Sequence, residues 1–200
     1  RQMCIRDRSM WLSASDESVV IGLLADESLR GEREINTPNN NRVAALKGGR
    51  QPLRNRSGLL GLNACKLIPS KYAKRIKYED SLVSGEDTVF MSQLLEFEDL
   101  TLVPCAPMAG SMYVRRMSDN SVSRQPESFD FCVTQRIAVI NCLIETRNRI
   151  HKKNAGAINY LIDNQASFIR KYYSSNPSRQ REVKDFISSN CIDRKVVRLG

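Results

Sequence analysis

The order of apolar and polar positions divides the first 130 residues into short strands and helices. Residues 18–24 form a continuous apolar run, which suits a buried strand of an α/β sheet. Residues 100–103 and 111–116 predict two further strands. Between them, residues 84–97 predict an amphipathic helix, because large apolar side chains recur near one stripe at Val89, Phe90, Leu94 and Phe97. The pattern therefore predicts an α/β fold for this part of the chain.

The segment between the first strand and this helix is mostly polar. Residues 26–56 predict a short helix and a basic loop, since residues 39–57 carry five Lys or Arg and no acid. An apolar stretch at 59–68 follows. Residues 71–76, just after Pro69, predict a short basic helix.

From residue 128 the pattern becomes helical as far as residue 190. The predicted helices are 129–150, 155–174 and 178–189, with breaks near Gly156 and Pro177. The first of them has an apolar face formed by Phe129, Val133, Ile137, Ile140 and Ile144. We expect this face to pack on the sheet.

The net positive charge of the chain comes almost entirely from the segment that contains these helices. The formal net charge is +9; residues 131–200 hold 13 Lys and Arg against 5 Asp and Glu, whereas residues 1–130 hold 18 against 17. Such a segment could contact an anionic membrane surface, a diphosphate or nucleic acid, and a solvated helix face is the simplest interpretation. The bases are scattered without interleaved aromatics, so no nucleic acid partner is expected.

The Cys and His content disfavours several kinds of site. The six cysteines form no C-x-x-C pair, and His151 is the single histidine. A Cys/His metal cluster is therefore not expected, nor is a Cys-His or Ser-His mechanism unless His151 lies in the site. Free thiols in a reducing cytosol are expected instead. No apolar run approaches the roughly 20 residues of a membrane span, so we expect a cytoplasmic protein that at most contacts the inner face of the membrane.

Three Glu-Asp dipeptides occur, and the one at Glu86 and Asp87 has the richest context, Ser84-Gly-Glu-Asp-Thr-Val-Phe-Met91. Ser84 stands three residues before Asp87, which predicts a helix start resembling a capping box. Two acids in a first turn also complement the helix dipole, by about 0.3–1 kcal/mol each when exposed. This structural role is compatible with a chemical one, because a carboxylate can begin a helix and still face a cleft.

Two further segments flank this one in the chain. Asn63-Ala-Cys-Lys-Leu-Ile-Pro-Ser-Lys-Tyr72 contains a Lys-Leu pair, and Tyr113-Val-Arg-Arg-Met-Ser-Asp-Asn-Ser-Val-Ser-Arg124 contains Tyr-x-Arg-Arg and Ser-x-Ser. In their order and spacing, the three segments resemble the second half of the family 2 glycosyltransferases of the GT-A fold, of bacterial type. The resemblance covers residues 59–124.

The resemblance implies an inverting sugar transfer. A carboxylate takes the proton from an acceptor hydroxyl as that oxygen attacks the anomeric carbon of a nucleotide sugar. By position, Asp87 corresponds to this general base, and Glu86 beside it orients the acceptor or caps the helix. The substrate-binding residues that the resemblance implies are Lys66, Tyr113, Arg115, Arg116, Ser121 and Ser123. On a strand, Arg115 and Arg116 point to opposite faces, so at most one faces the cleft, to contact a diphosphate or form a surface ion pair.

In this family a divalent metal, Mg or Mn, steadies the departing diphosphate and is held by an Asp-x-Asp motif in the N-terminal half. No Asp-x-Asp occurs in the 200 residues, and Glu96-Phe-Glu98 is the nearest spacing. We therefore expect the metal ligands and the nucleotide pocket to lie outside this chain. The donor sugar and the acceptor are not readable from it.

The sequence also predicts how the chain is divided. Residues 1–8 resemble a translated sequencing adapter joined to a reading frame, so the native protein is expected to continue upstream of Ser9. Residues 9–128 are then the acceptor-side part of a glycosyltransferase domain, and residues 129–200 a basic helical extension.

The implied partners are a nucleotide-sugar donor and a glycan or lipid-linked acceptor, as in the synthesis of cell-surface polysaccharides. The basic extension adds peripheral contact with the membrane. Two other classes remain open. One is a basic helical module that binds anionic membrane or nucleic acid through residues 131–200. The other is a structural or assembly role for the C-terminal helices.

Overall fold

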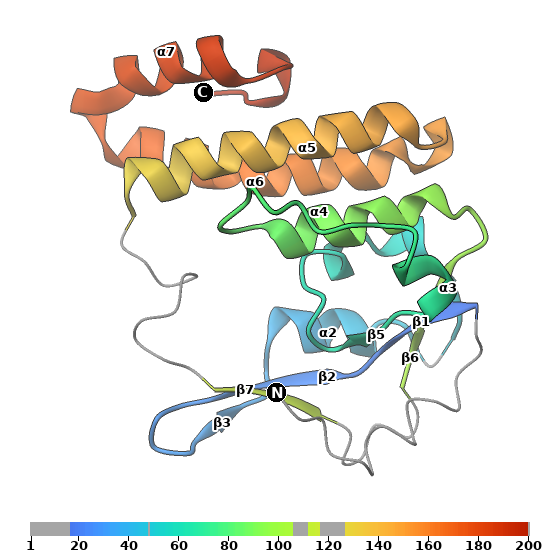
Figure 1. The fold of residues 1–200 in the computed structure, drawn as a ribbon. Coiled ribbons are helices and arrows are strands. Elements are labelled where there is room, and N and C mark those ends of the chain that lie inside the picture. The colour runs from blue at the N-terminus through green and yellow to red at the C-terminus, as the bar shows by residue number, and fades with distance from the viewer. Residues whose placement is uncertain (1–16, 48, 106–111, 117–126, 200) are drawn as a thin grey trace.

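The computed structural model describes residues 17–47, 49–105, 112–116 and 127–199 of the chain. These residues form a mixed α/β structure with two small mixed sheets and a helical C-terminal part. Helical layers lie above the sheets in Figure 1, with α4 between the long C-terminal helices and the sheet region. The coarse α/β prediction is confirmed.

The predicted strand at residues 18–24 is two strands, β1 (Ser18–Ile21) and β2 (Leu23–Glu27), which meet at Gly22. The chain changes partners here, because the amide of Gly22 donates to the Cys65 carbonyl over 2.8 Å and the Ile21 carbonyl accepts from Cys105 over 2.7 Å. All four residues of β1 are buried. A fully buried Val or Ile side chain contributes about 1.5–3 kcal/mol, so β1 anchors the sheet.

The first sheet has the strand order β4-β6-β1-β5. Strand β6 (Thr101–Pro104) runs parallel to β1, while β4 (Gln51–Pro52) and β5 (Lys66–Leu67) run antiparallel to their neighbours. The predicted strand at 100–103 is thus confirmed with a shift of one residue.

The second sheet has the order β3-β2-β7. Strand β7 (Met112–Arg116) is parallel to β2, and β3 (Arg33–Glu34) is antiparallel to it. The strand predicted at 111–116 is confirmed over its described residues. Since β1 and β2 follow each other directly, one extended segment of chain contributes to both sheets.

The short helices before residue 80 lie beside these sheets (Figure 1). They are α2 (Pro38–Ala44), the 3-10 helix η1 (Leu53–Leu59) and α3 (Ser70–Ala73). In α2, Asn40 accepts from the Leu24 amide over 2.9 Å and donates to the Leu24 carbonyl over 2.7 Å. This buried amide substitutes for a neighbouring strand and ties α2 to β2.

The C-terminal helices match the predicted boundaries closely. A π-helical turn, η4 (Asp130–Thr134), leads into α5 (Gln135–Arg149), and α6 (Ala155–Ser175) and α7 (Gln180–Asn190) follow. Three 3-10 turns complete this part: η5 (Lys152–Asn154), η6 (Pro177–Arg179) and η7 (Arg194–Val196). Among the described residues, no helix combines the length and apolar character needed to cross a membrane.

The apolar face predicted on the first of these helices is inside the protein. Val133, Ile137, Ile140 and Ile144 are each at most 2% exposed, and Phe129 is partly buried against the same cluster. The face packs mainly on α6 and α4 and not directly on a sheet, which corrects the expected packing partner. One hydrophobic core joins residues before and after position 128, so the helical extension shares its core with the rest of the chain.

Candidate functional site

The candidate site is built around the start of α4 (Glu86–Gln93), which the 3-10 turn η2 (Leu94–Glu96) continues. The residue before the helix is Gly85, whose φ of 91° lies in the left-handed region. Its carbonyl accepts from the amides of Thr88 and Val89 over 3.0 and 3.2 Å. Glu86 and Asp87 therefore occupy the first helical turn, as predicted.

The expected cap by Ser84 is wrong. The N-cap residue is Gly85 and not Ser84, and a glycine has no side chain that could cap the helix. Only a residue without Cβ fits here, because a Cβ on Gly85 would lie 2.7 Å from Cγ2 of Val139 in α5. The turn before α4 is thus shaped by close contact with a helix more than 50 residues later in the chain.

Arg136 in α5 strengthens this contact. It is 4% exposed, and its guanidinium donates to the Ser84 carbonyl over 3.3 Å and to Oε1 of Gln165 over 2.9 Å. The guanidinium also lies over the rings of Phe131 and Phe168, with 4.8 and 5.4 Å to the ring centroids. Burial lowers the pKa of Arg136, and the nearby Cys132 and Glu86 oppose that decrease. Arg136 therefore holds the loop that presents Glu86 and Asp87.

Lys66 of β5 interacts electrostatically with Asp87. It is 8% exposed, and its Nζ donates to the Leu62 carbonyl. Burial lowers the pKa of Lys66, whereas Cys65 and Asp87 act in the opposite direction. Lys66 and Asp87 thus interact electrostatically, and the resemblance had assigned both residues to one site.

Tyr78 is a member of this cluster that the sequence did not reveal. Its ring stacks on Phe90 of α4, with 4.2 Å between centroids and 9° between planes, and it remains 43% exposed. Partial burial raises the pKa of the Tyr78 phenol, and the Asp87 and Glu86 carboxylates raise it further. The Asn63 amide donates to the phenol oxygen.

The arginines of β7 are engaged with acids of β2. Arg115 forms a bidentate pair with Asp26 over 2.7 and 2.8 Å, and Arg116 contacts Glu27 over 3.3 Å. The hydrogen bonds that Arg115 donates to Asp26 raise the pKa of Arg115. The sequence left open whether these arginines contact a diphosphate or form surface ion pairs, and the structure shows ion pairs. A diphosphate contact would require Arg115 to give up a bidentate carboxylate partner.

Tyr113 lies two residues before Arg115 on the same strand, opposite Leu24 of β2. Ser121 and Ser123 lie outside the described residues, as do residues 1–8.

A pocket of about 690 Å³ lies at the opposite end of α4. It is lined by Arg75, Lys77, Gln93, Glu96, Glu98, Arg149, Ile150 and His151, and so contains neither Asp87 nor Tyr113. Several of its charged groups pair with each other: Arg149 lies 3.6 Å from Glu96, and His151 lies 4.0 Å from Glu98. Since the two ends of an eight-residue helix are about 12 Å apart, this pocket is separate from the candidate site.

The structure also bears on the metal ion that the resemblance implies. Within residues 17–47, 49–105, 112–116 and 127–199, no three His, Cys, Asp or Glu side chains gather in a way that could hold a metal ion. The five described cysteines are free thiols, four of them buried. The divalent metal that the resemblance implies thus finds no matching ligands in this part of the chain.

Comparison of the chain with protein-family models, with curated proteins and with solved structures gives no match.

Proposed function

We propose that this chain is the acceptor-side part of an inverting, nucleotide-sugar-dependent glycosyltransferase with a GT-A type of fold. The observation that carries the proposal is the placement of Asp87. It lies in the first turn of α4, where it interacts electrostatically with the buried side chain of Lys66, within a motif order that resembles this family. The two parallel strand pairs, β1 with β6 and β2 with β7, are compatible with part of an α/β sheet.

In the proposed reaction Asp87 accepts the proton of an acceptor hydroxyl as its oxygen attacks the anomeric carbon of the donor sugar. The bond from that carbon to the diphosphate breaks, and the diphosphate leaves with the electron pair. Glu86, one position earlier, is placed to bind a second hydroxyl of the acceptor. The acceptor is a glycan or a lipid-linked saccharide, as in the synthesis of a cell-surface polysaccharide.

The divalent metal is not part of this chain's contribution. The sequence contains no Asp-x-Asp, and the described residues offer no alternative cluster of ligands. In the proposal, the metal and the nucleotide are held by a donor-binding half that precedes this chain in a longer protein.

Calorimetric titration with nucleotide sugars and Mn²⁺ tests this division. We expect the 200-residue chain to show no binding, because the metal ligands are missing and donor positioning is a large contribution to such reactions. The longer protein with its donor half is expected to bind and transfer sugar. Micromolar donor binding by this chain alone would contradict the proposed location of the donor site. A thermal melt of the same sample verifies that the chain is folded.

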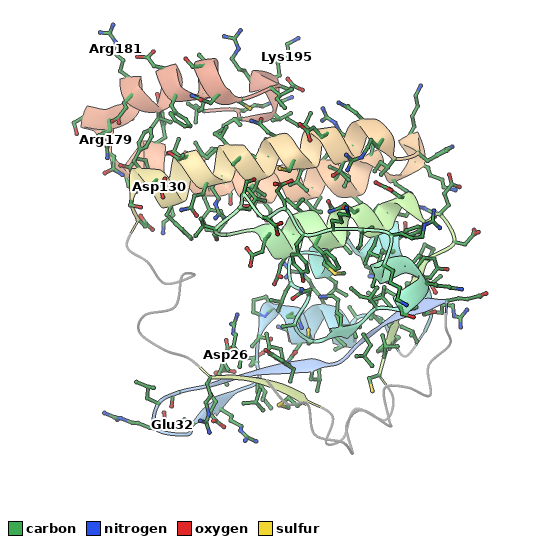
Figure 2. All side chains as sticks on the ribbon, viewed as in Figure 1. Asp26, Glu32, Asp130, Arg179, Arg181 and Lys195 are labelled. Atoms are coloured by element: carbon green, nitrogen blue, oxygen red, sulfur yellow. The ribbon has the colours of Figure 1, made fainter. Side chains whose placement is uncertain are left out.

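Peripheral membrane contact is proposed for α7 and the segment after it. Seven of the 13 bases in residues 131–200 form ion pairs within 4 Å. Among the described residues of 131–200, the bases that are exposed and have no ion pair are Lys152, Lys184, Arg194, Lys195 and Arg198. Four of these five lie between positions 184 and 198, near Ile192, which is 60% exposed. In Figure 2 Arg181 and Lys195 point outward on the side opposite Asp26 and Glu32.

Vesicle co-sedimentation tests the membrane contact. We expect binding to phosphatidylserine-containing vesicles at low salt and not to neutral ones, since each base near such a surface contributes about 1 kcal/mol. The double variant Lys184→Glu/Lys195→Glu should weaken this binding by about tenfold or more. The control Lys71→Glu/Lys74→Glu makes the same charge change on α3 and should have little effect. Equal binding to neutral and anionic vesicles, or equal loss in both variants, would contradict a contact through α7.

A further inference from the structure

An exposed aromatic ring lies beside the two carboxylates of the candidate site. Tyr78 is 43% exposed and belongs to the segment between α3 and α4. Phe90 covers one face of the ring at 4.2 Å, nearly parallel. The opposite face is therefore the one available to solvent. Stacking on a residue of α4 also restricts the ring, so a ligand that binds to it loses less conformational entropy than on a free side chain.

The groups around this ring have complementary hydrogen-bonding roles. The carboxylates of Glu86 and Asp87 lie near enough to the phenol to influence it electrostatically, and they accept hydrogen bonds. The Asn63 amide donates to the phenol oxygen, and its own carbonyl can accept. A flat apolar face is thus bordered by strong acceptors and an amide. Pyranose rings match this arrangement, since they have an apolar face of C–H groups and a rim of hydroxyl donors. The negative face of an aromatic ring attracts C–H hydrogens.

We propose that Tyr78 is the stacking platform for a pyranose ring of the acceptor, with Asn63 and Glu86 binding its hydroxyls. The inference rests on the proposed function, because it assigns the substrate class of that same site. It places the acceptor sugar over the exposed face of Tyr78, with one hydroxyl directed toward Asp87. Tyr78 then determines specificity for a saccharide over an alcohol that lacks an apolar ring face.

Saturation-transfer NMR on the 200-residue chain tests the platform without the donor half. The probes are the methyl β-glycosides of glucose, galactose and N-acetylglucosamine. We expect transfer from protein aromatic protons to the ring C–H protons of at least one of them. The variant Tyr78→Leu keeps an apolar side chain against Phe90 but removes the aromatic face, and should weaken binding by about 2–10-fold. Tyr78→Phe should bind nearly as well as the wild type.

Tyr160 provides a matched control. It is 39% exposed, lies on α6 and has no place in the candidate site, so Tyr160→Leu should leave sugar binding unchanged. Absence of transfer to all three glycosides in the wild type would overturn the inference, as would equal transfer in wild type and Tyr78→Leu. If Tyr160→Leu weakened glycoside binding as much as Tyr78→Leu does, the sugars would be stacking on any exposed tyrosine and not binding at one site. That result would also overturn the inference.

The longer protein separates this inference from the proposed function. Tyr78→Leu should raise the acceptor KM by about 2–10-fold with little change in kcat, because stacking holds the bound sugar in ground state and transition state alike. If Asp87→Asn leaves turnover unchanged while Tyr78→Leu weakens glycoside binding, the catalytic assignment fails and the sugar site stands. If Asp87→Asn abolishes turnover but Tyr78→Leu changes neither binding nor KM, the platform alone is refuted.

Discussion

In the longer glycosyltransferase that we propose, replacing Asp87 by Asn is expected to lower the turnover of sugar transfer by about 10²–10⁴-fold, the usual range for a positioned acid or base. Asn keeps the size of the side chain but cannot accept the acceptor's proton. Stability should change little, since loss of one acid from a first helical turn costs about 0.3–1 kcal/mol. The measurement is steady-state transfer from a nucleotide sugar, together with a urea denaturation curve of each variant.

Asp80 provides the matched control for this substitution. It belongs to another Glu-Asp dipeptide, Glu79-Asp80, and is exposed in the segment before α4. Asp80→Asn makes the same change in charge and size six residues from the start of the helix, and should leave turnover unchanged. Unchanged turnover in Asp87→Asn, or equal losses in the two variants, would remove Asp87 from the mechanism. A rise in KM alone would instead assign Asp87 to acceptor binding.

The elements of this chain could be predicted where local signals dominate. The C-terminal helices follow from apolar spacing and from breaks near Gly156 and Pro177, and the observed ends of α6 and α7 differ from the prediction by at most two residues. Strand β1 follows from its apolar run. Its division from β2 at Gly22 does not, because the change of partners depends on Cys65 and Cys105, which lie far along the chain.

The candidate site was predictable only as far as its local motif. The pattern placed Glu86 and Asp87 at a helix start, which the structure shows. It assigned the cap to Ser84, because a hydroxyl before two acids is a common signal, whereas contact with α5 decides the turn. Arg136 and Tyr78 carry no local mark of their roles, since each acts through a contact with residues distant in sequence or in another element.

The buried Asn40 and the paired Arg115 illustrate the same limit. An Asn in a polar stretch predicts a turn or cap, yet Asn40 replaces a strand partner for Leu24, 16 residues earlier. The resemblance made Arg115 a candidate for diphosphate contact, and no sequence pattern pairs it with Asp26, 89 residues away. Register between β2 and β7 puts the two side chains opposite each other. Polar side chains therefore receive their roles from topology, which a local pattern does not contain.

Gly85 is the position at which this long-range contact can be tested most directly. Its φ of 91° and the 2.7 Å that would separate an added Cβ from Cγ2 of Val139 are two independent reasons for glycine. A side chain in the left-handed region costs about 1–2 kcal/mol. Overpacking against a buried valine adds about 1–3 kcal/mol. Val139 is fully buried in α5 and cannot move aside freely.

Gly85→Ala is therefore expected to lower the free energy of unfolding by about 2–5 kcal/mol, measured by urea denaturation. Gly156→Ala is the matched control, because Gly156 lies in α6 with nothing within 4 Å of a new Cβ, so alanine should stabilise by up to about 1 kcal/mol. In Gly85→Ala/Val139→Ala the packing clash is relieved while the left-handed backbone remains. The loss of unfolding free energy in the double variant should therefore be smaller, by about 1–2 kcal/mol, than the sum of the losses in the two single variants. Additive losses would show that Val139 does not limit the turn, and a Gly85→Ala protein as stable as the wild type would show that α5 does not fix the start of α4.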